Sequence, residues 1–235
     1  MSEAAERQPG KTAPRFRIRG TRTVSRVPEI LRLCHSKKVL HLGCADVPYT
    51  LHRGERLLHK LLAEVTSPDK LWGIDLDEKG VGLLREMGFG NVLHGDCEQM
   101  AEALKQESFD VVLAGEIIEH VENPGLFLGS IRSIMVPTTE LLLTTPNASA
   151  LKNFLHAMLG EEKVHEDHNY YFSYRTLKQL LERTGFSCEE IYYYQDIEGR
   201  GLALLLDRTL SAMTHLRPLW SDGLIVRAKA LNATG

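Results

Sequence analysis

The sequence predicts an α/β protein with a doubly wound, mostly parallel sheet. Three observations support this fold class. Short apolar runs alternate with amphipathic segments of helical spacing from Lys38 to Phe186. The runs are continuously apolar, as expected of strands that are buried on both faces. Several of them stop at a glycine or an aspartate, residue types that commonly begin a loop.

The first half of the chain supplies three of the predicted strands. Apolar spacing gives, in order, a helix over Val24–Cys34, a strand over Lys38–Leu42, a helix over Leu51–Val65, a strand over Leu71–Ile74, a helix over Lys79–Met87 and a strand over Asn91–His94. Gly88 follows the last of these helices and suits a left-handed cap.

The second half continues the same alternation. The predicted elements are a strand over Phe109–Ala114, a helix over Pro124–Ile134, a strand over Leu141–Thr144, a helix over Tyr174–Thr184, a strand over Cys188–Tyr194 and a last strand over Gly223–Ala228. The connection Gly199–Asp222 is longer than an ordinary crossover and is expected to carry a helix over Leu202–His215. We interpret residues 199–222 as an insertion that shapes the substrate pocket.

The chain divides into a short arm and one domain. Residues 1–20 are polar and basic, and they predict either a flexible tail or an arm that folds over a substrate. Residues 21–235 have a length that suits a single domain with a full core.

Composition excludes several classes of function. The formal net charge of -3 gives no electrostatic support for nucleic acid or a membrane surface as a partner. No apolar run approaches the roughly 20 residues that a membrane-spanning helix needs. The four cysteines have no metal-type or disulfide-type spacing, which predicts reduced thiols in a cytoplasmic protein.

Small and acidic residues follow the predicted strands. In a doubly wound sheet, ligands bind beyond the carboxyl ends of the strands, near the point where the strand order reverses. Gly43 to Ala45 follow the first strand, where small side chains let a ligand approach the backbone closely. Asp75 is placed to accept hydrogen bonds from ribose hydroxyls, and Asp96 from an adenine amino group; each is alternatively a helix cap. Together the series favours an adenosyl cofactor.

Three stretches of the sequence resemble class I S-adenosylmethionine-dependent methyltransferases. They are FDVVLAGEIIEHVENPGLFL (Phe109–Leu128), LLLTTPNA (Leu141–Ala148) and HNYYFSYRTLKQLLERTGF (His168–Phe186). They are similar to a subgroup that includes ubiquinone-biosynthesis O-methyltransferases. The resemblance implies a Rossmann-like fold with a mostly parallel central sheet, helices on both faces and an antiparallel last strand.

The resemblance also implies S-adenosylmethionine as the cofactor and a set of residues that hold it. These residues are Gly43, Cys44, Ala45, Asp75, Leu76, Asp96, Cys97, Gly115 and Glu116. Gly43 and Ala45 would line the methionine part, Asp75 the ribose and Asp96 the adenine, with Cys97 beside it. The first motif departs from the family, because His41 stands at the usual acidic position, Ala45 at the second glycine and Val47 at the third.

The chemistry of methyl transfer points to histidines and to a metal. Removing the proton of an acceptor needs a base, and His120, His165 and His168 are candidates. For His165 and His168 the alternative is a solvated polar loop. Glu116, Glu119 and His120 would lie within one turn if a helix began there. They resemble a divalent-metal motif of ubiquinone-pathway methyltransferases and of RNA 3′-end 2′-O-methyltransferases, which add a later histidine; His165 or His168 could be that addition. Alternatively, Glu116 holds the cofactor, and Glu119 and His120 only begin a helix.

The function expected from these features is O-methylation of a small-molecule acceptor. Methylation of a nitrogen or carbon atom of the acceptor is the alternative within the same class of enzyme. Two further hypotheses come from other classes of function. The first hypothesis is a non-catalytic binding module that keeps the fold. The second is an RNA 2′-O-methyltransferase, which would require a basic surface patch.

Overall fold

The computed structural model describes residues 21–47, 56–104, 107–196, 209 and 211–231. The expected N-terminal arm, the beginning of the helix over Leu51–Val65 and most of the insertion at 199–222 lie outside these residues. Residues 211–216 are helical, which agrees with the end of the helix expected over Leu202–His215.

The described residues form one eight-stranded sheet with the order β1-β7-β8-β6-β5-β2-β3-β4. The strands are β1 (Thr23–Val24), β2 (Val39–Leu42), β3 (Leu71–Asp75), β4 (Val92–His94), β5 (Val111–Gly115), β6 (Glu140–Pro146), β7 (Phe186–Tyr194) and β8 (Gly223–Ala230). Only β8 runs antiparallel to its neighbours, β6 and β7, among these strands. The mostly parallel sheet with an antiparallel last strand is confirmed.

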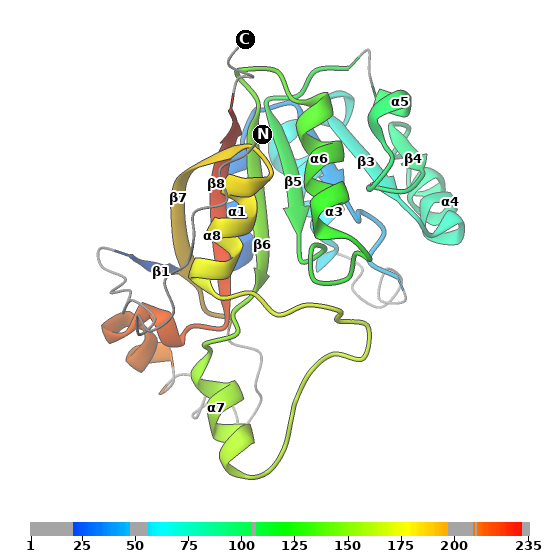
Figure 1. Ribbon diagram of the computed structural model, residues 1–235. Coiled ribbons are helices and arrows are strands. Elements are labelled where there is room, and N and C mark those ends of the chain that lie inside the picture. The colour runs from blue at the N-terminus through cyan, green and yellow to red at the C-terminus, as the bar shows by residue number, and fades with distance from the viewer. Residues whose placement is uncertain (1–20, 48–55, 105–106, 197–208, 210, 232–235) are drawn as a thin grey trace.

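The strand order reverses between β2 and β5. β2 pairs with β3 on one side and with β5 on the other. The chain therefore moves outward from β2 to β4 and then returns to continue from β5 in the opposite direction. The carboxyl ends of β2 and β5 form the crevice in which doubly wound folds bind ligands. They point toward the bottom of Figure 1.

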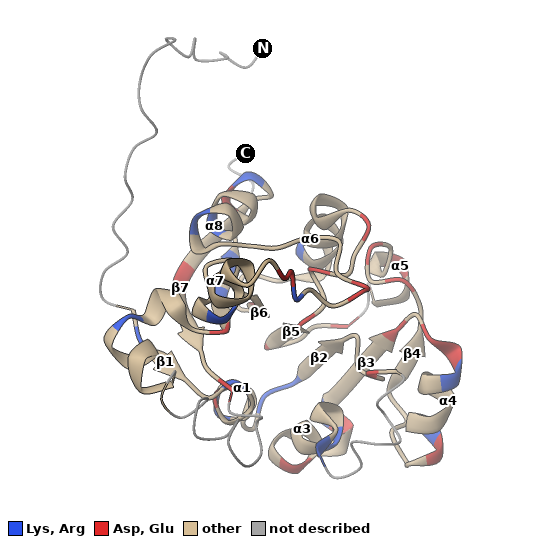
Figure 2. Cartoon of the chain, turned by 90° about the horizontal axis from the view of Figure 1, so that it is seen from below, with Lys and Arg blue, Asp and Glu red and all other residues tan. Residues whose placement is uncertain are grey.

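Helices cover both faces of the sheet (Figure 2). One face carries α1 (Arg26–Cys34), α3 (Leu58–Thr66) and α4 (Glu78–Glu86), and the other carries α5 (Ala101–Leu104), α6 (Pro124–Ile134) and α8 (Tyr174–Arg183). A further helix, α7 (Leu151–Met158), lies off the sheet beyond the carboxyl end of β6 (Figure 1). None of the helices in the described part of the chain is long and apolar enough to cross a membrane.

Three elements of the structure were absent from the sequence-based expectations. β1 pairs Thr23 and Val24 with the end of β7, so Val24 belongs to a strand and not to the helix expected from that residue. A strand of two residues has no periodicity to detect. α5 has four residues, again too few for a pattern. α7 has no buried residue, so it lacks the core-facing stripe by which helices are recognised in a sequence.

The core has one layer on each side of the sheet. Phe127 and Ile131 of α6 and Leu177 of α8 are fully buried against one face. Ile30 of α1 and Leu62 of α3 are fully buried against the other. Each such side chain contributes about 1.5–3 kcal/mol when it leaves water. These two layers fix the helices that carry the loops at the carboxyl edge.

A buried carboxylate ties α1 to β7. Glu29 is only 7% exposed, and it accepts hydrogen bonds from the Tyr192 hydroxyl at 2.8 Å and from Arg22 at 2.9 Å. Arg32 donates two more, both at 2.8 Å. The hydrogen bonds from Arg32 are the largest cause that lowers the pKa of Glu29 from 4.5 to about 2. The network therefore stabilises the folded state whenever Glu29 is ionised.

We expect Glu29→Gln to lower the free energy of unfolding by about 2 kcal/mol at neutral pH, because charge-assisted hydrogen bonds are lost. The folded-state pKa lies below the unfolded one, so the wild-type advantage is complete above pH 4.5 and disappears as the pH falls toward 2. Urea unfolding at a series of pH values measures this. Glu86→Gln, at an exposed position of α4, is the control. A loss that is equal for both variants, or that does not change with pH, would contradict the assignment.

Candidate active site

The loop after β2 folds tightly at the crevice. Gly43 has a φ of +67°, and its backbone amide donates to the carbonyl of Ile74 at 2.9 Å. A side chain at Gly43 would be strained by this φ, and its Cβ would lie 3.0 Å from Ile117. Ala45 is not among the residues with positive φ. Alanine therefore meets no backbone penalty at this position, where the family pattern has glycine.

Asp75 joins two loops at the carboxyl edge. One carboxylate oxygen accepts from the Ala45 amide at 2.8 Å, and the other accepts from the Asp77 amide at 2.9 Å. Asp77, two residues later, is the cap of α4, since its side chain accepts from the Gly80 amide at 2.6 Å. The helix-cap role that was the alternative for Asp75 therefore belongs to Asp77, the N-cap of α4. A carboxylate has about four acceptor sites, so Asp75 keeps capacity for further donors.

The loops after β3 and β4 carry the other predicted cofactor residues. Leu76 is 70% exposed directly beside Asp75. Asp96 accepts from the Glu98 amide at 2.8 Å, and Cys97 beside it is buried. Burial raises the pKa of the Cys97 thiol to about 12. An exposed leucine, a half-buried carboxylate and a neutral thiol are therefore presented at one end of the sheet.

Glu116 sits in strained backbone at the end of β5. Its φ is +53°, although it is not glycine, and such strain in a non-glycine residue concentrates at functional sites. The Glu116 amide donates to the carbonyl of Thr144 at 3.0 Å. One carboxylate oxygen accepts from the Tyr194 hydroxyl at 2.9 Å. The other is buried without a hydrogen-bond partner in the described part of the chain.

Arg26 and Tyr194 were missed by the sequence reasoning. Arg26 begins α1 and pairs with Asp196 at 3.3 Å, with its guanidinium 5.6 Å from the centre of the Tyr194 ring. Burial lowers the pKa of Arg26, but the nearby charges, Glu116 first, outweigh this effect and raise it. Tyr194 is the last residue of the predicted strand Cys188–Tyr194. Examining the end of this strand, as was done for the others, would have identified it. A single arginine near the start of a helix gave no such signal.

His41 pairs with a second histidine under the crevice. The Nδ1 atoms of His41 and His59 lie 3.2 Å apart, and the two rings are stacked. Both side chains are buried. Burial lowers the pKa of His59 to about 4 and the pKa of His41 well below its usual value. The position that is acidic in the family pattern, His41, therefore holds a neutral imidazole that is hydrogen-bonded to His59 of α3.

Glu119, His120 and His168 form a cluster beside Glu116. One potential ligand atom from each of the three lies within 4.8 Å of the others. Glu119 is 1% exposed and accepts from the Thr145 hydroxyl at 2.9 Å, while its other oxygen is buried without a partner in the described residues. Burial, and then the charge of Glu116, raise the pKa of Glu119 to about 9. Neutral imidazoles and a buried carboxylate are groups that bind a divalent cation.

The three candidate histidines occupy one corner. The His120 ring centre lies 4.6 Å from that of His168 and 5.9 Å from that of His165. Burial lowers the pKa of His120, and lowers that of His168 to about 4. His168 Nδ1 is buried without a partner in the described part of the chain. The hypothesis of a solvated polar loop therefore fits His165, which is exposed, better than it fits His168.

Of the expected metal set, two members belong to the compact cluster. Glu119 and His120 share it with His168, one of the two histidines considered as a later addition to the motif. Glu116 lies next to Glu119 but is bonded to Tyr194. This geometry favours a three-residue ligand set of Glu119, His120 and His168, with Glu116 as a neighbouring charge.

Comparison with known proteins places the chain in a family. The sequence model of the methyltransferase domain matches residues 19–191. A ubiquinone biosynthesis O-methyltransferase of Hahella chejuensis is 30% identical over 133 residues, which are 54% of this chain and 50% of that protein. The mitochondrial ubiquinone biosynthesis O-methyltransferase of Arabidopsis thaliana is 26% identical over 79% of this chain and 59% of that protein. The chain thus spans only half to three fifths of the length of these relatives.

Solved structures show the same fold. A SAM-dependent methyltransferase from Archaeoglobus fulgidus superposes with a TM-score of 0.57 at 17% identity, covering 86% of this chain and 92% of that chain. Magnesium protoporphyrin IX methyltransferase from Synechocystis, with bound SAH, gives a TM-score of 0.55 at 15% identity, covering 87% of this chain and 81% of that chain. The fold is that of class I S-adenosylmethionine-dependent methyltransferases. Because the domain model matches well over half of the residues, the chain belongs to the methyltransferase-domain family.

The neighbouring residues Tyr193 and Tyr194 provide a matched test of the Glu116 site. We expect Tyr194→Phe to lower the free energy of unfolding by about 1–3 kcal/mol, because the buried Glu116 carboxylate loses its hydroxyl donor. Tyr193→Phe is the control, since the Tyr193 hydroxyl is buried without a partner among the described residues. Its removal should cost less than about 0.5 kcal/mol or stabilise the protein. Equal losses in urea unfolding would argue against the Tyr194 contact.

Proposed function

We propose that this protein transfers the methyl group of S-adenosylmethionine to a hydroxyl oxygen of a small molecule. The observation that carries the oxygen assignment is the cluster of Glu119, His120 and His168 next to the crevice between β2 and β5. A hydroxyl is a poor nucleophile until it loses its proton, and these side chains offer basic groups and metal ligands for that purpose. The resemblance to ubiquinone-biosynthesis O-methyltransferases supports the same choice.

The residues at the carboxyl edge suit the parts of the cofactor. Asp75 would accept from the ribose hydroxyls, the exposed Leu76 would pack on the adenine, and Asp96 would accept from its amino group. The tight loop of Gly43, Cys44 and Ala45 would admit the methionine part, with Gly115 and Cys97 beside it. One oxygen of Glu116, buried without a partner among the described residues, suits the ammonium group, and the half-buried Arg26 suits the carboxylate.

Methyl transfer asks little covalent chemistry of the protein. The acceptor oxygen forms a bond to the methyl carbon while the bond from that carbon to sulfur breaks, and the thioether product leaves. The hydroxyl proton passes to a base, for which His120, His168 and the more exposed His165 are the proposed groups. The lowered pKa values keep His120 and His168 neutral near pH 7, so each has a lone pair that can accept a proton.

The cluster also fits a divalent cation. Two buried atoms without described partners, one oxygen of Glu119 and Nδ1 of His168, belong to it. When bound, such an ion would lower the pKa of an acceptor hydroxyl. Glu119, His120 and His168 would hold it, and Glu116 would add negative charge beside it.

The cysteines support a cytoplasmic location as part of this proposal. Cys34, Cys44, Cys97 and Cys188 are free thiols, and three of them are buried. Reduced cysteines that lie in the core are typical of proteins from reducing compartments.

Cofactor binding is the first test of the function. We expect the protein to bind S-adenosylhomocysteine in calorimetry and Asp75→Asn to bind it about ten- to a hundredfold more weakly, because a charged acceptor for the ribose is lost. Asp77→Asn is the control, since asparagine also caps helices well. Absence of binding by folded wild-type protein would refute the enzyme hypothesis. Binding without transfer of labelled methyl groups to any compound of a metabolite extract would favour a non-catalytic binding module.

The proposed cation is tested by titration of chelated protein with Mg²⁺, Mn²⁺ and Zn²⁺. We expect one ion to bind, and His168→Asn to weaken its binding at least about tenfold, since one of three ligands is removed. His165→Asn, in the same segment but outside the compact cluster, should change the affinity by less than about threefold. Full methyl transfer by metal-free protein would reject the ion and leave the histidines as bases.

A further inference from the structure

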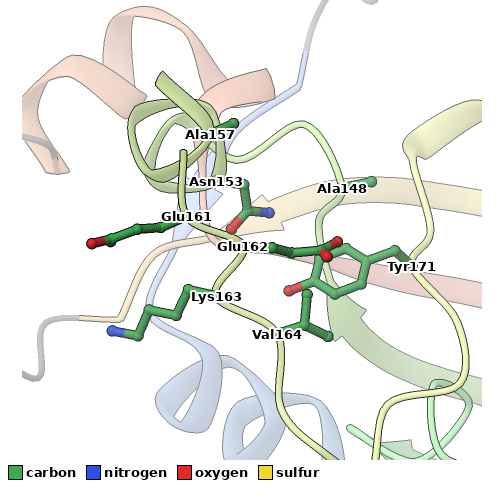
Figure 3. Close-up of a pocket in the computed structure, with 8 residues that line it drawn as sticks. All are labelled: Ala148, Asn153, Ala157, Glu161, Glu162, Lys163, Val164 and Tyr171. Carbon is green, nitrogen blue, oxygen red and sulfur yellow. The ribbon is translucent and has the colours of Figure 1, made fainter. Parts of the chain in front are cut away.

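A cavity lies between α7 and the chain that follows this helix. Its volume is about 380 Å³, within the roughly 300–1,000 Å³ of pockets for small molecules. Its walls come from the end of β6, from α7 and from the following segment (Figure 3). They include Ala148, Asn153, Ala157, Glu162, Val164 and Tyr171. Seen from below, α7 and this segment lie in front of β5 and β6 (Figure 2), so the cavity is at the edge where methyl transfer is proposed.

Tyr171 connects the cavity with the Glu119 cluster. Its ring is part of the cavity wall, and its centre lies 6.0 Å from that of His168. Burial raises the pKa of the Tyr171 hydroxyl. The charges of Glu119 and Glu162 raise it further, against Lys152. Tyr171 thus lies within electrostatic reach of the cluster on one side and of the cavity carboxylate on the other.

The charged residues of the cavity are not equivalent. Glu161 accepts a hydrogen bond from His156 Nδ1 at 3.0 Å. Its side chain points away from Tyr171 (Figure 3). Lys163 also points outward in this view. Glu162 extends toward Tyr171 (Figure 3), and it has no hydrogen bond or ion pair with any residue that the structure describes.

Lys152, whose charge lowers the pKa of Tyr171, already has a partner. Lys152 of α7 forms an ion pair with Asp222 at 3.0 Å. The cavity is open to solvent: Ala148, Ala157, Glu162 and Val164 are exposed, and the Tyr171 ring is half-buried. Its lining combines small apolar side chains, an aromatic ring and, at Glu162, a carboxylate without a cationic partner in the described chain. A carboxylate beside an aromatic ring suits a protonated amine, because ion pairing and cation–π attraction act on the same group.

We infer that this cavity is the acceptor pocket and that it takes a small aromatic or aliphatic molecule carrying a protonated amine. The amine lies at Glu162, and the methyl-accepting group is directed past Tyr171 toward Glu119. The inference rests on the proposed function, since it names the substrate class of the same site. Ala148, Ala157 and Val164 would contact the apolar body of the acceptor. Asn153 would supply one further polar contact.

Three phenols of similar size test the charge preference. Tyramine carries an amine, para-propylphenol is neutral and para-hydroxyphenylpropionate carries a carboxylate. Their binding is measured by calorimetry on protein saturated with S-adenosylhomocysteine. We expect tyramine to bind about five- to tenfold more tightly than the neutral phenol, since an exposed ion pair and a cation–π contact each contribute modestly. The anionic phenol should bind most weakly.

Variants of Glu162 decide the assignment. Glu162→Gln should reduce the preference for tyramine to less than about twofold, and Glu162→Lys should reverse it toward the anionic phenol. Glu161→Gln, one residue away and bonded to His156, should keep the wild-type preference. An equal preference in wild type and Glu162→Gln would overturn the inference. So would absence of phenol binding while S-adenosylhomocysteine binds, an outcome that leaves the proposed function standing. Failure to bind S-adenosylhomocysteine would instead refute both.

Discussion

Two carboxyl groups at the end of β5, Glu119 buried and Glu116 half-buried, are the constraint on which the rest of the site depends. Glu116 and Glu119 each keep one buried oxygen without a partner in the described chain. Ionising both groups would leave uncompensated negative charge there, which is costly, and the raised pKa of Glu119 reflects that cost. Tyr194 of β7 donates a hydrogen bond to Glu116, and Thr145 of β6 donates one to Glu119. The positive charge of Arg26 from α1 lies near Glu116. Segments far apart in the sequence therefore converge on one strand end. A site that retains this cost after such compensation is arranged for cationic partners, which in this account are the cofactor's ammonium group and a metal ion.

The sequence allowed the prediction of the sheet and of its ligand edge, because buried parallel strands leave continuous apolar runs that end in recognisable residues. Asp75, Asp96 and Glu116 were predicted in this way, and the structure places them at the ends of β3, β4 and β5. It did not allow the prediction of Arg26, whose role depends on β1 holding the start of α1 against the end of β7. Nor did it give α7, which has no buried face. Pairing across about 170 residues and a helix that lies off the sheet leave no local pattern in the sequence.

The His41–His59 pair explains how the fold tolerates its departure from the family motif. Two buried neutral imidazoles whose Nδ1 atoms lie 3.2 Å apart can share one proton between these atoms. His59 Nε2 stays buried without a partner in the described chain. Burial lowers the pKa of His41, and His59 and Arg26 lower it further, so this imidazole stays neutral. In the proposed site, negative charge for the cofactor's ammonium group would come from Glu116, directly after the neighbouring strand β5.

The most direct measurement is a crystal structure of the protein with S-adenosylhomocysteine and Mn²⁺, in which anomalous scattering locates both the ion and the sulfur. The account predicts the ribose within hydrogen-bond distance of Asp75, the sulfur between the ends of β2 and β5, and the ion on Glu119, His120 and His168. A nucleoside bound away from Asp75, or an ion that ignores Glu119 and His168, would contradict the claim that these strand ends form one methyl-transfer site.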